Sequence, residues 1–477
     1  MSEDRKYVKK ERLAGEDLSF WWLDSPMQPT TMAMLMVLDR APEEKSLRAA
    51  FGRAVRVVPR LAQRVVDAPL DLTLPHWEAD PTFDLDYHLR RHKLARGADL
   101  GELFHEIGPA YETPFDRSRP LWEARVYEGI GSSQRAAVFF KLHHALADGV
   151  GGNAIFAALT DAEREPKRSL RAGPGGREKG AWPQSSSWGS QLLDALRDRI
   201  ELDVDRAQSI ASTVVDTLQH PDNLKRALDM VASIAETAQF ESGSPLKASG
   251  GRARRMVGME LPFAEVRALK LSLGGCMIDV ILTIMALAMR KWHTAHGLGE
   301  VRELMTLVPV NLRRREDWTE GVAVGNVTTG ILVPLPIGGR KGPLALHREI
   351  RSRMDAKKVD PVSMAAPALA EVMSALPRQL VTWMSQSTYG SIDFIVTNVP
   401  GILVPRYLAG SEIEAAYPFA PIAARSPASI ALYGYRDSLF IGIDADSGVM
   451  PDTDGFERMV RDAFEELREA VGRSKKK

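Results

Sequence analysis

Two adjacent histidines, His143 and His144, have the side-chain type and setting in this chain that best suit catalysis. They follow an apolar run at residues 136–142, whose length and aromatic content predict a buried β-strand. Such a strand would present an imidazole, which titrates near neutral pH, on a rigid element, as a general base requires. The same residues also suit a core histidine or a metal ligand, so residue type alone leaves three interpretations open.

A metal site at this pair is disfavoured because adjacent strand residues point to opposite faces. The sequence contains no His-Glu-x-x-His and no Cys-x-x-Cys that could complete one, so we expect no metal. His88 and His92 stand four residues apart with two arginines between them, which predicts a solvated helix. After the histidine pair, Asp148 precedes the glycine-rich stretch 149–153, where we expect a sharp turn.

The spacing His-His-x-x-x-Asp-Gly resembles the signature of the acyltransferase superfamily that contains chloramphenicol acetyltransferase, carnitine acyltransferases and peptide-synthetase condensation domains. The resemblance implies that His144 takes the proton from the attacking hydroxyl or amine and that His143 supports the loop. It implies that Asp148 has a structural role and pairs with an arginine, for which Arg313 is a candidate, although orientation of the imidazole is the alternative. At Gly149 a side chain would collide with substrate or force an unfavourable φ.

Further motifs occur in the order typical of bacterial wax ester synthase/diacylglycerol acyltransferases, and the resemblance runs from about residue 13 to about residue 465. They are an opening segment at 18–23 with 26–28, Pro120-Leu121-Trp122, the stretch 309–313, Gly325-Asn326 with Leu335-Pro336, and Thr397-Asn398-Val399-Pro400-Gly401. One departure is Ile278 before Asp279, where the family usually has Asn-Asp; this puts any role of that Asn in doubt.

The resemblance implies an α/β fold of two chloramphenicol-acetyltransferase-like domains with a tunnel at their interface. It implies transfer of a fatty acyl group from acyl-CoA to diacylglycerol or a long-chain alcohol. Asn398, Asp279 and Trp122 are candidates for substrate or oxyanion contacts, and Asn398 also suits a turn before Pro400. Arg313, Arg314 and Arg315 are candidates for the nucleotide of coenzyme A.

Direct attack by the alcohol needs no Ser or Cys nucleophile, and the sequence has no Gly-x-Ser-x-Gly elbow. We therefore expect no covalent acyl-enzyme and no cofactor, with acyl-CoA as a substrate. Two alternatives remain open. The first is a carrier-protein-dependent condensation or polyketide-associated acyltransferase, and the second is a non-catalytic lipid-binding protein.

The composition limits which partners, cellular compartment and membrane contacts are expected for this chain. Sixty-two basic and 62 acidic residues balance among 477, so charge gives no reason to expect a nucleic-acid partner. The single cysteine, Cys276, suits a reducing cytoplasm and is expected to be a small buried residue. We expect no signal peptide and no spanning helix, because the N-terminus lacks an apolar core and no apolar run reaches about 20 residues. Any contact with a membrane or lipid droplet should be peripheral.

The chain divides into an expected N-terminal acyltransferase domain at 1–165, a linker with amphipathic helices at 166–250, and a C-terminal domain at 251–477. Glycine, serine and proline at 167–189 predict the linker. Expected strands include 32–38, 301–310, 324–334 and 392–398, with a hairpin of 430–435 and 438–444 and a closing helix at 453–473. Alternating Met32, Met34 and Met36 suit a core strand or an acyl-chain channel.

Overall fold

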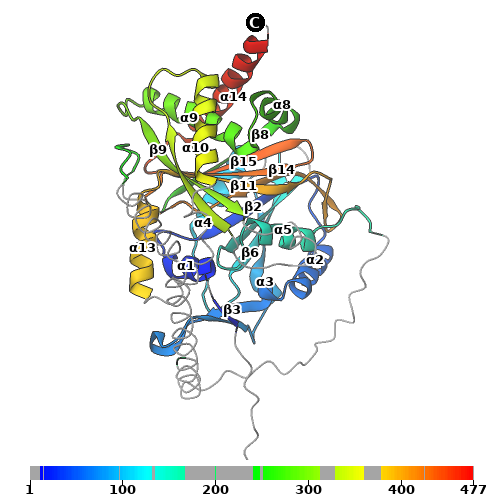
Figure 1. Ribbon diagram of the computed structural model, residues 1–477. Coiled ribbons are helices and arrows are strands. Elements are labelled where there is room, and N and C mark those ends of the chain that lie inside the picture. Colours follow the sequence, from blue (N-terminus) through cyan, green and yellow to red (C-terminus); the bar gives the residue numbers. More distant parts are fainter. Residues whose placement is uncertain are drawn as a thin grey trace, which may run out of the picture.

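The computed structural model describes residues 11–13, 15–95, 97–131, 135–166, 199, 240–247, 251–311, 328–358, 378–423 and 425–475. These residues form two six-stranded sheets that pack against each other, with helices around them (Figure 1). The linker expected at 167–189 and the arginines 313–315 lie outside the described residues, as do the helices expected at 192–240 apart from Arg199 and Phe240.

The first sheet contains most of the N-terminal strands. Its order is β12 (Tyr407–Leu408), β13 (Ser411–Phe419), β2 (Thr31–Leu38), β7 (Arg135–His143), β6 (Trp122–Ile130) and β5 (Leu89–Lys93). Helices α2 (Glu44–Val57) and α5 (Gly149–Leu159) lie against each other at one face of this sheet, while α4 (Leu100–Glu112) lies at the other. Short helices α3 (Leu85–His88), η1 (Pro59–Ala62) and η2 (Pro69–Asp71) and a small sheet of β1 (Glu11–Arg12), β4 (His76–Ala79) and β3 (Gln63–Val66) complete this part.

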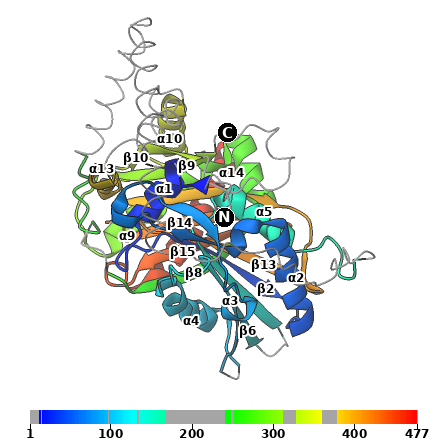
Figure 2. The ribbon, with the colours of Figure 1, turned by 90° about the horizontal axis from the view of Figure 1, so that it is seen from below.

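The second sheet is built from C-terminal strands. Its order is β10 (Thr328–Pro336), β9 (Glu303–Asn311), β11 (Phe394–Ile402), β14 (Ala428–Tyr435), β15 (Ser438–Asp446) and β8 (Arg254–Pro262). Four helices cover its outer side, namely α8 (Phe263–Leu273), α9 (Met277–Ala295), α10 (Pro343–Lys358) and α14 (Thr453–Lys475) (Figures 1 and 2). Helix α9 is buried on nearly every side between the sheet, α10 and α14, which explains its almost continuous apolar sequence.

The expected domain boundaries do not separate the two sheets. Strands β12 and β13 come from the C-terminal half of the chain but complete the first sheet, where β13 pairs antiparallel with β2. The division at 165 and 250 therefore stays a prediction, and residues 407–419 of the expected C-terminal domain contribute strands to the first sheet. Strand pairing decides sheet membership here, and β13 pairs with β2 over residues that are far apart in sequence.

The close approach of the two sheets depends on small residues. A Cβ built on Gly442 of β15 would lie 1.7 Å from the carbonyl oxygen of Pro418 on β13. Because no side chain fits in that space, a glycine is required for β13 to pack on the second sheet. The antiparallel pair of β14 and β15, with Tyr435 opposite Ser438, confirms the expected hairpin.

Lys141 is a buried charged residue in the largely apolar strand β7, and its hydrogen bonds show how it is accommodated. Its side chain is buried, and its Nζ donates hydrogen bonds to the carbonyl oxygens of Ala110 and Thr113 at 2.7 and 2.6 Å. These carbonyls lie at the C-terminal end of α4, where a positive charge is favoured. Burial lowers the pKa of Lys141 to about 8. The lysine thus ties β7 to α4 two residues before the histidine pair.

A helix that crosses a bilayer must be both long and apolar. Within the described ranges, no single helix meets both criteria. Helices α8 and α9 meet them only when taken together, and that pair is bent by 99°.

Candidate functional site

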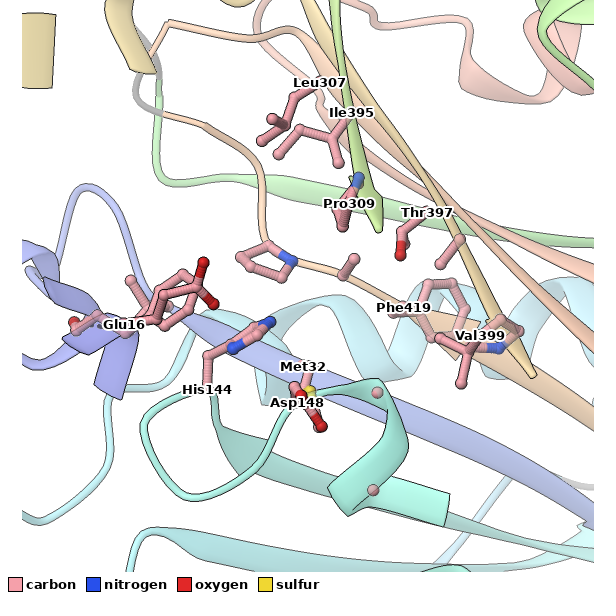
Figure 3. A pocket seen from close by; sticks show the side chains of 18 of the residues that line it. Glu16, Met32, His144, Asp148, Leu307, Pro309, Ile395, Thr397, Val399 and Phe419 are labelled. Atoms are coloured by element: carbon pink, nitrogen blue, oxygen red, sulfur yellow. Dashed lines mark hydrogen bonds between the residues drawn. The ribbon is translucent and has the colours of Figure 1, made fainter. Parts of the chain in front are cut away.

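A cavity of about 460 Å³ lies where the two sheets meet α5 and the N-terminal helix α1 (Gly15–Leu23). Side chains from β2, β7, β9 and β11 line it, together with α13 (Arg378–Gly390), and most of them are apolar. Figure 3 shows His144 near its centre, between Glu16 on one side and Thr397 and Pro309 on the other. The site therefore combines residues from both halves of the chain.

A backbone hydrogen bond and a ring contact help to hold His144 in place. Its N–H donates to the carbonyl oxygen of Thr30 at 2.8 Å, and its imidazole stacks on Phe20 with ring centroids 4.0 Å apart. The ring lines the cavity and is half-buried. The imidazole of His144 is therefore held in a defined orientation while its ring stays open to the cavity.

His143 points away from the cavity and is buried. Its Nδ1 accepts a hydrogen bond from the N–H of Ala145 at 3.0 Å, so the proton of the neutral ring is on Nε2, which lies 3.0 Å from Thr30 Oγ1. Its hydrogen bonds join the strand end to the turn that follows and to Thr30. The two histidines therefore face opposite sides, as strand geometry requires.

Asp24 supports this arrangement and was not recognised from the sequence. Its Oδ2 lies 3.7 Å from His143 Nε2, and Arg117 donates to it at 2.9 Å. Burial raises the pKa of Asp24, but hydrogen bonds from His143, Arg117 and the Thr30 N–H outweigh burial and lower it to about 2. No short motif marks this residue, because its partners are distant in sequence.

Asp148 caps helix α5. Its Oδ1 accepts hydrogen bonds from the N–H groups of Val150 and Gly151 at 3.0 and 2.8 Å, which are the bonds of an N-cap. The expected sharp turn at 149–153 is wrong, because α5 begins at Gly149 and includes this stretch. An aspartate cap compensates for the low helix propensity of the glycines that follow. The proposed partner, Arg313, lies outside the described residues.

The unfavourable φ expected at Gly149 is wrong, whereas the expected collision with substrate stays a prediction. Its φ is not positive, and a Cβ built on it would lie 2.9 Å from Val399 Cγ2 on β11. The collision would thus be with the other half of the protein. Close by, the Asn153 side chain donates a hydrogen bond to the carbonyl oxygen of Pro400. Helix α5 and β11 therefore form a tight seam beside the cavity.

We expect Gly149→Ala to lower both turnover and stability, because overpacking at such a contact typically costs about 1–3 kcal/mol. Val399→Ala should restore part of both losses in the double variant, since it removes the two methyl groups that the new Cβ would meet. Thermal unfolding and initial rates of the two single variants and the double variant measure this coupling. Strictly additive losses would show that the contact with Val399 is not the cause.

Asn398 borders the cavity, but Thr397 presents its side chain to it. In β11, Asn398 pairs with Leu432 of β14, and Thr397 pairs with Ala431, which lines the cavity. Strand alternation therefore places the Asn398 side chain on the face of Leu432. Its interpretation as a turn residue is wrong, because β11 continues to Ile402.

Trp122 does not reach the cavity. It is buried in the hydrophobic core that packs on the first sheet, where it stacks on His88 and Phe51 and its Nε1 donates to the carbonyl oxygen of Leu61 at 2.7 Å. His88 is therefore a core residue at the end of α3, and the expected solvated helix is wrong. The preceding Leu121 accepts a hydrogen bond from the His143 N–H at 2.9 Å. The Pro120-Leu121-Trp122 motif therefore positions the end of β7 and packs against the first sheet.

Asp279 and Ile278 lie in the first turn of α9, outside the cavity lining. Asp279 is buried, and its Oδ2 accepts from the N–H of Cys276 at 2.6 Å, which caps the helix. Ile278 packs against the second core, which is the hydrophobic cluster between the second sheet and the helices that cover it. Cys276 is exposed, so its expected burial is wrong. The structure therefore does not bring this motif together with His144.

Sequence comparisons identify two domains along the chain. Residues 13–281 match the wax ester synthase/diacylglycerol acyltransferase catalytic domain, and residues 324–468 match the C-terminal domain of the same proteins. A putative diacylglycerol O-acyltransferase of Mycobacterium tuberculosis is 30% identical over 407 residues, which are 83% of this chain and 79% of that protein. A probable diacylglycerol O-acyltransferase of the same species is 26% identical and covers 91% of this chain and 90% of its own.

Solved structures share the fold. The wax ester synthase/diacylglycerol acyltransferase from Marinobacter aquaeolei VT8 superposes with a TM-score of 0.65 at 19% identity, covering 97% of this chain and all of that one. The first condensation domain of the calcium-dependent antibiotic synthetase gives a TM-score of 0.63 at 15% identity and covers 98% of this chain and 97% of its own. The expected pair of chloramphenicol-acetyltransferase-like domains is thus confirmed. Together with the matches along almost the entire sequence, this fold places the chain in the wax ester synthase/diacylglycerol acyltransferase family, as an O-acyltransferase.

Proposed function

We propose that this protein transfers a fatty acyl group from acyl-CoA to the free hydroxyl of diacylglycerol, and to a long-chain alcohol as a second acceptor. The observation that carries the proposal is the placement of His144 inside an apolar cavity shared by both halves of the chain. An apolar cavity suits two lipid substrates, and exclusion of water from it disfavours hydrolysis of the thioester. Coenzyme A enters as part of a substrate and leaves as a product.

In the proposed reaction the acceptor oxygen attacks the thioester carbonyl carbon while His144 removes the hydroxyl proton. The tetrahedral intermediate collapses with cleavage of the carbon–sulfur bond, and the proton passes from His144 to the leaving thiolate. The oxyanion needs a hydrogen-bond donor. Thr397, with its hydroxyl directed into the cavity, is a better-placed candidate than the Asn398 side chain.

The proposal is tested with purified protein and labelled palmitoyl-CoA, given dioleoylglycerol or hexadecanol, with products separated by thin-layer chromatography. We expect labelled triacylglycerol and, with the alcohol, labelled wax ester. A parallel reaction supplies the palmitoyl group on the phosphopantetheine arm of a carrier protein. Product formed with the carrier-bound donor but not with palmitoyl-CoA would contradict the proposal and support a condensation-type acyltransferase. Lipid binding without product from either donor would favour the non-catalytic alternative.

A further inference from the structure

The cavity has an arm inside the N-terminal half that the proposed chemistry does not by itself require. We call it the methionine arm. It lies between α5 and the sheet formed by β2 and β7, and its lining consists of Met32, Met34, Met36, Phe140, Leu142 and Phe156. In the sheet, Met32 pairs with Leu142 and Met34 with Phe140. The side chains from β2 and β7 therefore share one face of the sheet, and Phe156 comes from α5. These six side chains are all apolar.

The methionine arm is closed at one end. Met32 and Met34 are partly exposed, whereas Met36 is completely buried. The arm therefore starts near His144, next to Met32 in Figure 3, and ends at Met36. Four residues of strand span about 13 Å, at about 3.3 Å per residue. This length and the closed end fit one extended hydrocarbon chain whose terminal methyl group meets Met36.

The opposite part of the cavity has a different character. Towards α1 and α13 its lining includes polar residues such as Gln28, Ser385 and Thr388 beside apolar ones. An acceptor such as diacylglycerol carries a hydroxyl and ester groups as well as two chains. Polar groups in the lining can hydrogen-bond to those esters, and buried esters without partners would be costly. The purely apolar arm suits a saturated acyl chain better.

We infer that the methionine arm binds the acyl chain of the donor and that Met36, at its closed end, sets the preferred chain length. This inference rests on the proposed function and adds the location of the acyl chain to it. Unbranched thioether side chains adapt to chains of slightly different length. Gly152 of α5 leaves room at the entrance, because a Cβ built on it would lie 3.3 Å from Met32 Cε.

The test compares donors from octanoyl-CoA to stearoyl-CoA at a fixed acceptor, and then alcohols of different length at a fixed donor. Met36→Ala should move the preferred donor to longer chains, and Met36→Phe should move it to shorter ones. We expect the ratio of kcat/KM for long and medium donors to change by about tenfold in opposite directions, since one methylene in an apolar pocket changes selectivity about 10- to 200-fold. The alcohol preference should stay unchanged.

Met285→Ala is the matched control, because Met285 is equally buried but belongs to the second core, outside the cavity. It should reduce stability without changing the donor preference. If Met36→Phe does not fold, Gly152→Ala narrows the entrance and should weaken use of every long donor relative to a short one. Displacement of a fluorescent fatty acid by acyl-CoAs of different length measures chain preference without turnover.

An unchanged donor profile in folded, active Met36 variants would overturn the inference and leave the proposed function intact. A shift in the alcohol profile instead would place the acceptor in this arm and also overturn it. If the wild-type protein makes no product but Met36→Ala shifts the binding preference, the methionine arm stands and the proposed function fails.

Discussion

Replacement of His144 by alanine is expected to reduce acyl transfer by about 10²–10⁴-fold, the usual contribution of a positioned general base. The imidazole lines the cavity, where it can accept the hydroxyl proton, and its ring is held against Phe20. His144→Gln should lose nearly as much, because an amide cannot take up the proton although it nearly preserves the volume. Initial rates with saturating donor and acceptor measure both variants.

The control for this prediction is His105→Ala, since His105 is an exposed residue of α4 outside the cavity lining. It should retain full turnover. Thermal unfolding of the His144 variants should remain close to that of the wild type, and acyl-CoA binding should persist. A His144→Ala protein that keeps its rate within a few fold would show that another group accepts the proton.

The second large effect concerns Asp444, a buried carboxyl group on β15 that faces the contact between the two halves. Neither of its oxygens has a hydrogen-bond partner among the residues the structure describes. Burial raises the pKa of Asp444 to about 7, and nearby Arg254 only partly offsets this. The folded protein therefore binds more protons than the unfolded chain between about pH 4 and pH 7. Stability should consequently fall as the pH rises through this window.

Asp444→Asn mimics the protonated carboxyl group and should abolish this loss. At pH 8 we expect the variant to be more stable than the wild type by about 4 kcal/mol, because about three pH units at 1.36 kcal/mol each separate the folded and unfolded pKa values. The difference should disappear near pH 4. Urea unfolding at both pH values measures it. A difference that is independent of pH would contradict the assignment.

Asp446, two residues further along the same strand, provides the matched control. Its carboxylate accepts hydrogen bonds from the N–H groups of Gly251 and Gly448, and it lies 3.8 Å from Arg254. Asp446→Asn weakens these contacts and should therefore destabilise the protein at pH 8, in the opposite direction to Asp444→Asn.

Much of the fold could be predicted from the sequence, because many strands and helices show a periodic pattern of apolar residues within their own segment. Strand β2 and helix α14 lie within two residues of their expected bounds, because alternation and helical periodicity are local signals. Strand β13 was missed. Pro418 interrupts its pattern, and within sheets proline is confined to edge strands and bulges. Strand β12 pairs with β13 only at Ser411 and Glu412, so β13 is an edge strand at Pro418, which a local pattern does not reveal.

The site could be predicted in part. The histidine pair was found because its spacing is a local motif, and the opposite directions of His143 and His144 follow from strand geometry. The contacts that explain Gly149 and position His143 involve Val399 and Asp24, which are far away in sequence. Trp122 and Asp279 belong to motifs as well, yet they pack and cap. A motif alone does not distinguish a residue that touches substrate from one that holds the scaffold.

The pairing of β13 with β2 also constrains how the protein is made. When the ribosome has completed the first 250 residues, β2 still lacks its neighbour, which arrives only after residue 419. Until then the nascent chain exposes a strand edge with unpaired N–H and C=O groups, which can pair with other chains. The first sheet can therefore be completed only after residue 419 has been synthesised, and the cavity, which residues up to Ala431 line, is completed late as well.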